Sequence, residues 1–177
     1  PDGAVVVVPD PTPAVTVGLA PVKGQRPEWA IQKLTELGVD AIWLLVAERS
    51  VVRWEDDDAP RVSRLERVIR EAGMQSRRTH LPTLRVGVPV AEAMEAPADV
   101  SLADPGGAPP SLARPTVLVG PDGGWSEAER AAAPSLVGLG PTILRAETAA
   151  VAAGAVLTSL RAGLVREAPP APCTEGG

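Results

Sequence analysis

The sequence predicts an α/β domain built on a mostly parallel sheet. Short apolar segments alternate along the chain with segments that have the period of amphipathic helices. One apolar run, Ala41–Ala47, is almost continuous, as in a strand buried on both faces. The 17 glycines and 20 prolines are concentrated between these segments, where they indicate loops rather than low complexity.

The first half of the chain contains two predicted strands and two predicted helices. Val15–Leu19 is a short apolar strand. Pro27–Leu37 is a helix, because proline suits the first helical position and Gly38 suits the position just after the last. Residues 41–47 form the buried strand, and residues 57–76 repeat apolar side chains at helical spacing.

The second half continues the alternation. Ser126 and Glu129 have the spacing of a capping box, which predicts a helix through Ala133. A long final helix is expected over residues 146–164. Its stretch 149–157 is apolar on all sides, so we expect it to be buried on more than one face. Further strands are expected at residues 98–103, 116–119 and 135–139.

Composition excludes several functions. The chain has one cysteine, Cys173, and one histidine, His80, which cannot build a Cys/His metal site or a disulfide framework. Tyrosine and phenylalanine are absent, which excludes a sheet of stacked aromatics for RNA. The longest apolar stretch is too short to span a bilayer, and no signal peptide opens the chain, so a cytoplasmic protein is expected.

Three regions are expected from this pattern. Residues 1–14 are expected to be a linker or remnant, residues 15–165 the folded domain, and residues 166–177 a disordered tail. Because the chain opens with Pro1 rather than methionine, it is expected to be a fragment.

Two glycine-rich loops follow predicted strands, where ligands of parallel sheets bind. Residues 119–126 combine three glycines with a proline ahead of a helix N-terminus. Taken alone, this loop is more typical of an ordinary tight turn. Residues 139–149 run from apolar residues and glycine into the final helix. They could wall an adenine-sized pocket, or form a buried connection in which Arg145 pairs with Glu147.

Residues 23–39, with the sequence KGQRPEWAIQKLTELGV, resemble the segment that opens the catalytic domain of the RsmE family. This family comprises bacterial 16S ribosomal RNA uracil-N3 methyltransferases of the SPOUT superfamily. Three further blocks agree in order: residues 48–51, residues 71–78 with Pro82, and the two glycine loops. Asp122 and Met74 depart from the glutamate that is usual or frequent in the family at these positions.

The resemblance implies a SPOUT methyltransferase fold with a deep C-terminal trefoil knot, a topology that general rules of chain connection would not suggest. It also implies a homodimer, with S-adenosyl-L-methionine bound near the subunit interface and no metal. The family's N-terminal PUA-like barrel would not fit in the short sequence before Val15. The cofactor-binding residues implied are Leu118, Val119, Gly120, Pro121, Asp122, Gly123, Gly124, Leu139, Gly140, Ile143, Leu144, Thr148 and Ala149. Valine at either Gly123 or Gly140 is expected to abolish cofactor binding.

Methylation at uracil N3 requires a proton to be lost or shared, and charge to be stabilised. Arg145, planar and permanently charged, is the expected partner of a uracil oxygen. Glu147 could accept the N3 proton or orient Arg145, but capping the last helix is the more ordinary role for an acid in a first turn. His80 is expected to be a solvated surface residue.

The substrate implied is 16S ribosomal RNA or the small ribosomal subunit. The net charge of −5 opposes RNA binding, but residues 61–85 carry seven arginines and two glutamates, a local charge of +5. Four of these arginines form an i, i+3 series, which taken alone is more typical of a solvated helix face paired with Asp56, Asp57 and Asp58. The RNA-binding residues expected near the cleft, where structural pairing is the alternative, are Lys23, Arg26, Lys33, Arg49, Arg77 and Arg78.

Three of the four tryptophans, Trp29, Trp43 and Trp54, are expected in the core or an interface, and the role of Trp125 stays open. Two other functions also stay open at this point. The chain could methylate another RNA, such as a tRNA ribose, or it could be a non-catalytic module for RNA binding or ribosome assembly.

Overall fold

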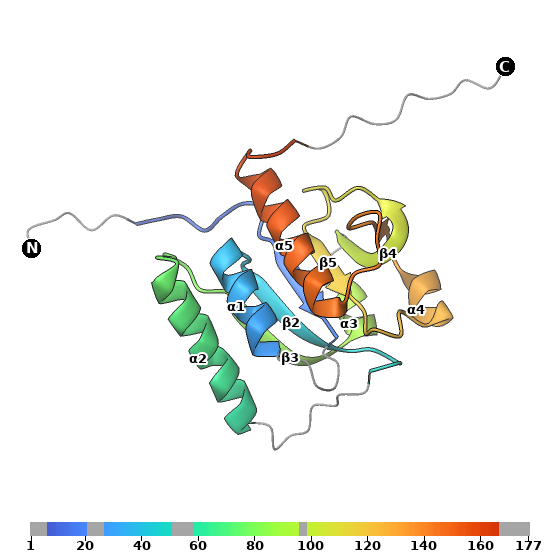
Figure 1. Cartoon of the computed structure of the whole chain (residues 1–177), viewed down its shortest axis with the longest axis horizontal. Coiled ribbons are helices and arrows are strands. Elements are labelled where there is room, and N and C mark those ends of the chain that lie inside the picture. Colours follow the sequence, from blue (N-terminus) through green and yellow to red (C-terminus); the bar gives the residue numbers. More distant parts are fainter. Residues whose placement is uncertain (1–6, 21–26, 51–58, 96–98, 167–177) are drawn as a thin grey trace, which may run out of the picture.

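The computed structural model describes residues 7–20, 27–50, 59–95 and 99–166. In these ranges, six strands form one sheet in the order β3-β2-β1-β5-β4-β6, and every described strand pair is parallel (Figure 1). The strands are β1 (Thr16–Leu19), β2 (Ala41–Val46), β3 (Thr83–Pro89), β4 (Val100–Ala108), β5 (Thr116–Val119) and β6 (Leu136–Val137). The helices are α1 (Pro27–Leu37), α2 (Ala59–Gln75), α3 (Val90–Glu95), α4 (Glu127–Ala132) and α5 (Ala146–Arg161). The predicted α/β class with a mostly parallel sheet is confirmed.

Alternate residues of the central strands enter two separate cores, one on each face of the sheet. Ile42 and Leu44 of β2 join a core covered by α1, α2 and α5, whereas Trp43 and Leu45 join a smaller core on the opposite face. This explains why the apolar run of β2 is continuous rather than alternating.

The structure differs from the predicted elements mainly at the sheet edges. Strand β3 and the following α3 were not predicted. Strand β4 runs on to Ala108 instead of ending at residue 103, and β6 has only two residues. Helix α5 ends at Arg161, before Gly163 with a φ of 70°. The predicted start of α2 at residues 57–58, the predicted tail from residue 167 and residues 1–6 of the predicted linker lie outside the described residues.

A half-buried charge cluster fixes the amino end of β2 to the end of α5. The Asp40 carboxylate accepts hydrogen bonds from the Val15 amide at 2.8 Å and from both Arg78 and Arg161. Arg78 also donates to the Val39 carbonyl at 2.6 Å, and Arg161 donates to the Gly38 carbonyl at 2.8 Å. Burial lowers the pKa of Arg78, and the Asp40 charge opposes that shift. Of the two roles expected for Arg78, the structure shows structural pairing, because its donors face these acceptors rather than solvent.

Helix α5 is buried on one face only. Its small residues pack on α1 and on the sheet: Gly154 is so close to Leu34 of α1 that a Cβ there would lie 2.8 Å from the leucine side chain. On the opposite face, Ala152 and Ala155 are half-buried and Val156 is exposed. The expectation that 149–157 is covered on more than one side is therefore not met within a single chain.

Two of the predicted core tryptophans can be placed. Trp43 is buried, whereas Trp29 is 45% exposed and so is not a core residue; Trp54 lies outside the described residues. His80 contacts the Val8 carbonyl and the Asp10 carboxylate at the surface. No helix in the described ranges is long and apolar enough to cross a membrane, and these ranges contain no cluster of residues suited to hold a metal ion.

Candidate functional site

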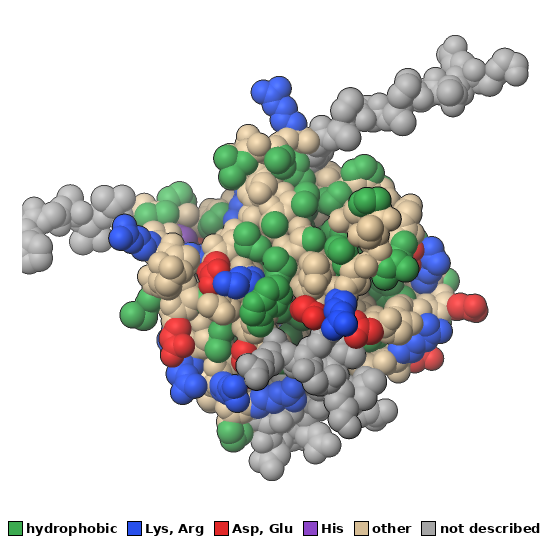
Figure 2. Space-filling view, viewed as in Figure 1, with side chains coloured by type: hydrophobic (Ala, Val, Ile, Leu, Met, Phe, Trp, Pro, Cys, Tyr) green, Lys and Arg blue, Asp and Glu red, His purple; other side chains and the backbone are tan. Residues whose placement is uncertain are grey.

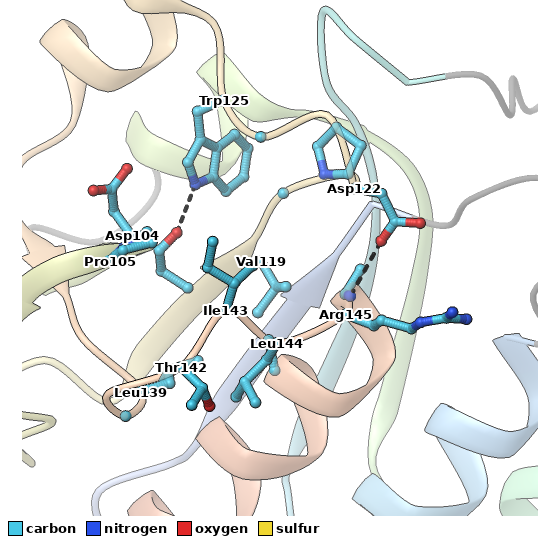
Figure 3. Close-up of a pocket in the computed structure, with 17 residues that line it drawn as sticks. Asp104, Pro105, Val119, Asp122, Trp125, Leu139, Thr142, Ile143, Leu144 and Arg145 are labelled. Atoms are coloured by element: carbon cyan, nitrogen blue, oxygen red, sulfur yellow. Dashed lines mark hydrogen bonds between the residues drawn. The ribbon is translucent and has the colours of Figure 1, made fainter.

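A cavity of about 530 Å³ lies beyond the carboxyl ends of β5 and β6, between the two glycine loops and the middle of β4 (Figure 3). This volume is within the range of sites for small organic ligands. Its walls are formed by Ala103, Asp104, Pro105, Val119, Gly120, Pro121, Asp122, Gly124, Trp125, Leu139, Gly140, Thr142, Ile143, Leu144, Arg145, Ala146 and Ala149.

The first glycine loop forms one wall through a tight turn. The Gly124 amide donates to the Pro121 carbonyl at 2.8 Å, and Gly124 has a φ of 69°, which favours glycine. The indole Nε1 of Trp125 donates to the Ala103 carbonyl at 2.9 Å, so this ring joins the first loop to the middle of β4 (Figure 3). Immediately beyond, the predicted capping box of Ser126 and Glu129 is present at the start of α4.

The second glycine loop contributes the apolar wall and leads into α5. Leu139 and Leu144 pack partly against the core, whereas Ile143 is 89% exposed. Gly140 has a φ of 145°, and a Cβ there would meet no atom within 4 Å, so this backbone borders open space. The loop ends at Arg145, the N-cap residue of α5, whose own side chain makes no capping bond.

A carboxylate from the first loop, that of Asp122, binds the N-terminus of α5 instead. Oδ1 of Asp122 accepts from the Ala146 amide at 3.5 Å, which places a negative charge at the positive end of the helix dipole. The two glycine loops are thereby joined on the cavity side (Figure 3).

Two further charged side chains, Asp104 and Arg145, line the cavity, and a third, Glu147, lies beside it in the sequence. Asp104 is largely buried and pairs with Arg130 at 2.8 Å. The Arg145 guanidinium points away from Trp125 on the Asp122 side, and no ion-pair partner for it lies among the described residues (Figure 3). Glu147 does not line the cavity; its buried Oε2 has no hydrogen-bond partner among the described residues. The Arg145–Glu147 pair considered from the sequence is therefore not observed.

Most of the predicted cofactor residues line the cavity, but three do not. Leu118 is fully buried in the core, because its side chain points to the opposite face from Val119. Gly123 sits at the outer tip of its turn, and Thr148 is on the exposed side of α5. Gly123 also lacks a positive φ. Its backbone conformation therefore gives no reason to expect that a side chain at this position would abolish cofactor binding.

The prediction from sequence did not include one wall of the cavity, which is formed by Ala103, Asp104 and Pro105. These residues belong to β4, which was predicted to end at residue 103 because the following Asp-Pro-Gly-Gly has the composition of a turn. Trp125, Thr142 and Ala146 were also not predicted as lining residues, although each lies inside a predicted loop or beside it. The signal in the sequence that these three residues line the cavity was their position within a glycine loop.

The residues expected to bind RNA are in different situations. Arg77 is exposed, and no side-chain partner for it lies in the described ranges. Lys33 pairs with Glu36 at 2.8 Å, and Arg49 donates to the Gly123 carbonyl at 3.0 Å. Lys23 and Arg26 lie outside the described residues.

The arginine series on α2 is partly neutralised. Arg64 pairs with Glu28 at 3.2 Å and Arg67 with Glu71 at 3.7 Å, whereas the aspartates expected to pair with this series, Asp56, Asp57 and Asp58, lie outside the described residues. Positive side chains nevertheless gather over the lower part of α2 (Figure 2).

Residues 9–158 match the sequence profile of a family described as RNA methyltransferase domain. The chain belongs to this family. The match spans the whole sheet and both glycine loops, so the cavity lies within the RNA methyltransferase domain itself.

Similar proteins agree with this assignment. Ribosomal RNA small subunit methyltransferase E of Mycobacterium bovis is 37% identical over 176 residues, which cover 84% of this chain and 64% of that protein. The chain thus spans less than two thirds of that relative's length. Such relatives confirm the resemblance drawn from the sequence blocks.

Two solved structures are similar in fold and sequence. A ribosomal RNA small subunit methyltransferase E from Neisseria gonorrhoeae, bound to S-adenosyl methionine, has a TM-score of 0.72 at 31% identity, covering 82% of this chain and 65% of its own. A putative methyltransferase from Legionella pneumophila, in complex with the cofactor SAM, has a TM-score of 0.71 at 28% identity with the same coverages.

Proposed function

We propose that this RNA methyltransferase domain binds S-adenosyl-L-methionine in the cavity and transfers its methyl group to N3 of a uracil in 16S ribosomal RNA. The observation that carries the proposal is the convergence of both glycine loops on one cavity at the carboxyl edge of a parallel sheet. The relatives' names and the cofactor in the similar structures support the cofactor and the substrate.

The residues around the cavity fit this cofactor. Leu139, Leu144 and Trp125 offer apolar surface for a purine. Gly124 and Gly140 present backbone without a side chain, and a Cβ at either would project into open space. When bound, the cofactor supplies an activated methyl group on a sulfonium, so the protein's task is to position the uracil and stabilise its charge.

Arg145 is the proposed catalytic residue. It borders the cavity, is exposed, and has no ion-pair partner among the described residues, which supports a role in binding a uracil oxygen. A planar, permanent cation stabilises the negative charge that develops as N3 loses its proton. Glu147 is the proposed proton acceptor, because it directly follows Ala146 of the cavity wall and its Oε2 has no hydrogen-bond partner among the described residues.

We further propose that the domain works as a homodimer formed through the outer face of α5. This face bears the half-buried Ala152 and Ala155 and the exposed Val156, and apolar side chains lie over α5 in Figure 2. A partner there would also be close to Ile143, an exposed apolar residue of the cavity wall. Charged substitution of Ala155 should therefore yield a monomer with weaker cofactor binding.

The deep C-terminal trefoil knot is also part of the proposal. Its support is the contact between the extension of β4 and the segment after β6, where the Gly138 amide donates to the Ala108 carbonyl at 2.9 Å. A Cβ on Gly107 would lie 2.5 Å from the backbone of Val137, so the two segments pass without space for a side chain. For RNA binding, the exposed Arg77 is the proposed phosphate contact among the described residues.

The test is methylation of small ribosomal subunits, with the modified base mapped and cofactor binding measured by calorimetry. Arg145→Ala should lower turnover at saturating RNA and cofactor by about 10²-fold, as expected for loss of a group that stabilises the transition state. Arg70→Ala, an exposed arginine on α2, is the matched control. Modification of a tRNA ribose, or cofactor binding without methylation of any RNA, would each overturn the proposal.

A further inference from the structure

Two segments that are distant in sequence are joined beside the first glycine loop. In the turn after β2, Ala47–Ser50, the backbone amide of Glu48 donates a hydrogen bond to Oε1 of Glu129 at 2.9 Å. In the same turn, Nη1 of Arg49 donates to the Gly123 carbonyl at 3.0 Å. The 81 and 74 residues that separate these partners make both bonds tertiary contacts.

The Glu129 carboxylate performs two tasks with its two oxygens. Oε2 accepts the Ser126 amide at 2.9 Å and completes the capping box of α4, which leaves Oε1 for Glu48. The turn that supplies Glu48 is closed on itself, because the Ser50 hydroxyl accepts from the Ala47 amide at 2.9 Å. A closed turn is a fixed support for the loop that it holds.

These bonds hold the glycine loop on the side away from the cavity. On the cavity side, the loop is joined to α5 by the 3.5 Å contact of Asp122, which is longer than either of them. Neither Arg49 nor Glu129 lines the cavity. Their contacts with the loop are the route by which they would influence a ligand in this cavity.

We propose that Glu129 and Arg49 are positioning residues, which hold the first glycine loop in the conformation that binds the cofactor. This inference rests on the proposed function. It also assigns Arg49 a role other than RNA binding, since its guanidinium is engaged by the loop.

The variants are Arg49→Ala, Glu129→Gln and the double variant, with cofactor affinity measured in the absence of RNA. Glutamine keeps one oxygen for the capping box but offers an amide, which cannot accept, to the second N–H. Each single variant should weaken S-adenosyl-L-methionine binding about three- to ten-fold. The double variant should lose no more cofactor affinity than the single variant that binds more weakly. The reason is that the two hydrogen bonds join the same two segments, so their effects should not add.

Glu127→Gln is the matched control, since it removes the same charge from an exposed position in the same helix. Arg49→Lys should recover part of the affinity, because an ammonium can still donate to the Gly123 carbonyl. Turnover at saturating cofactor and RNA should stay within about twofold of wild type, since the loss appears in binding. Wild-type affinity in Arg49→Ala, additive losses, or a loss seen only with RNA present would each overturn the inference. Failure of the wild-type protein to bind the cofactor would instead overturn the proposed function.

Discussion

Replacement of Gly140 by alanine tests whether the second glycine loop must adopt its observed backbone to bind the cofactor. Gly140 has a φ of 145°, and a Cβ built there meets no atom within 4 Å. The substitution therefore introduces no steric clash in the free protein. Its cost is the backbone strain of a residue with a Cβ in a region almost confined to glycine, about 1–3 kcal/mol.

That strain can appear in two measurable quantities. If the exposed loop relaxes to another conformation, the binding-competent population falls and cofactor affinity drops by about 5- to 140-fold. If the packing of Leu139 and Leu144 holds the loop in place, the strain lowers stability instead, and the melting temperature falls by about 2–12 °C. Calorimetric titration with S-adenosyl-L-methionine and thermal unfolding of the same samples measure both quantities.

Gly123→Ala is the control, because it lies in the other glycine loop, has no positive φ and also borders open space. It should bind within about twofold of wild type and melt at the same temperature. The reasoning is refuted if Gly140→Ala matches wild type in both measurements, or if the two alanine variants are equally impaired.

Three other substitutions have defined outcomes. Arg161→Met removes the hydrogen bonds to the Gly38 carbonyl and to Asp40 and should lower the free energy of unfolding by about 2–3 kcal/mol. The melting temperature should then fall by about 4–12 °C, and a fall below about 2 °C would contradict this. Gly107→Ala should destabilise by about 3 kcal/mol, because backbone lies 2.5 Å from the new Cβ. A variant as stable to urea as wild type would show that this contact can open. Arg77→Ala should reduce the slope of log affinity for RNA against log salt by about one while cofactor affinity is unchanged, and an unaltered slope would remove Arg77 from the RNA interface.

The sequence was sufficient for the elements whose signals are local. The continuous apolar run of β2, the proline at the start of α1 and the capping box of α4 each predicted an element that the structure contains. These signals depend on burial on both faces or on backbone groups at a helix end, which are encoded within a few residues.

Strand β3 could not be predicted in the same way. It lies at the sheet edge, contains Gly87 with a φ of 72°, and ends at Pro89, both of which argue against a strand when read locally. Its pairing with β2 shifts register between Leu44 and Leu45, next to that glycine, so the irregular composition accompanies an irregular strand.

The candidate site shows the same limit. The two glycine loops could be recognised from their glycines, but the wall formed by Ala103–Pro105 could not, because the Asp-Pro-Gly-Gly sequence there indicates a turn, whereas β4 continues through it. Likewise, Arg78 could not be separated from Arg77 by sequence. The two are adjacent, and only the fold places Asp40 and the Val39 carbonyl beside one of them.

The Asp40 cluster also has a consequence for how the domain forms during synthesis. The Asp40 carboxylate binds Arg161, which is synthesised 121 residues later. Arg161 also donates to the Pro13 carbonyl, which is 148 residues earlier in the chain. At translation rates of about 5–20 residues per second, about 6–24 s pass between the synthesis of Asp40 and that of Arg161. Throughout that interval, β1 and α1 lack the helix that covers them, and their apolar surface is open to other chains. In this architecture, the order of synthesis leaves the core of the amino-terminal half incomplete until the last helix has been made.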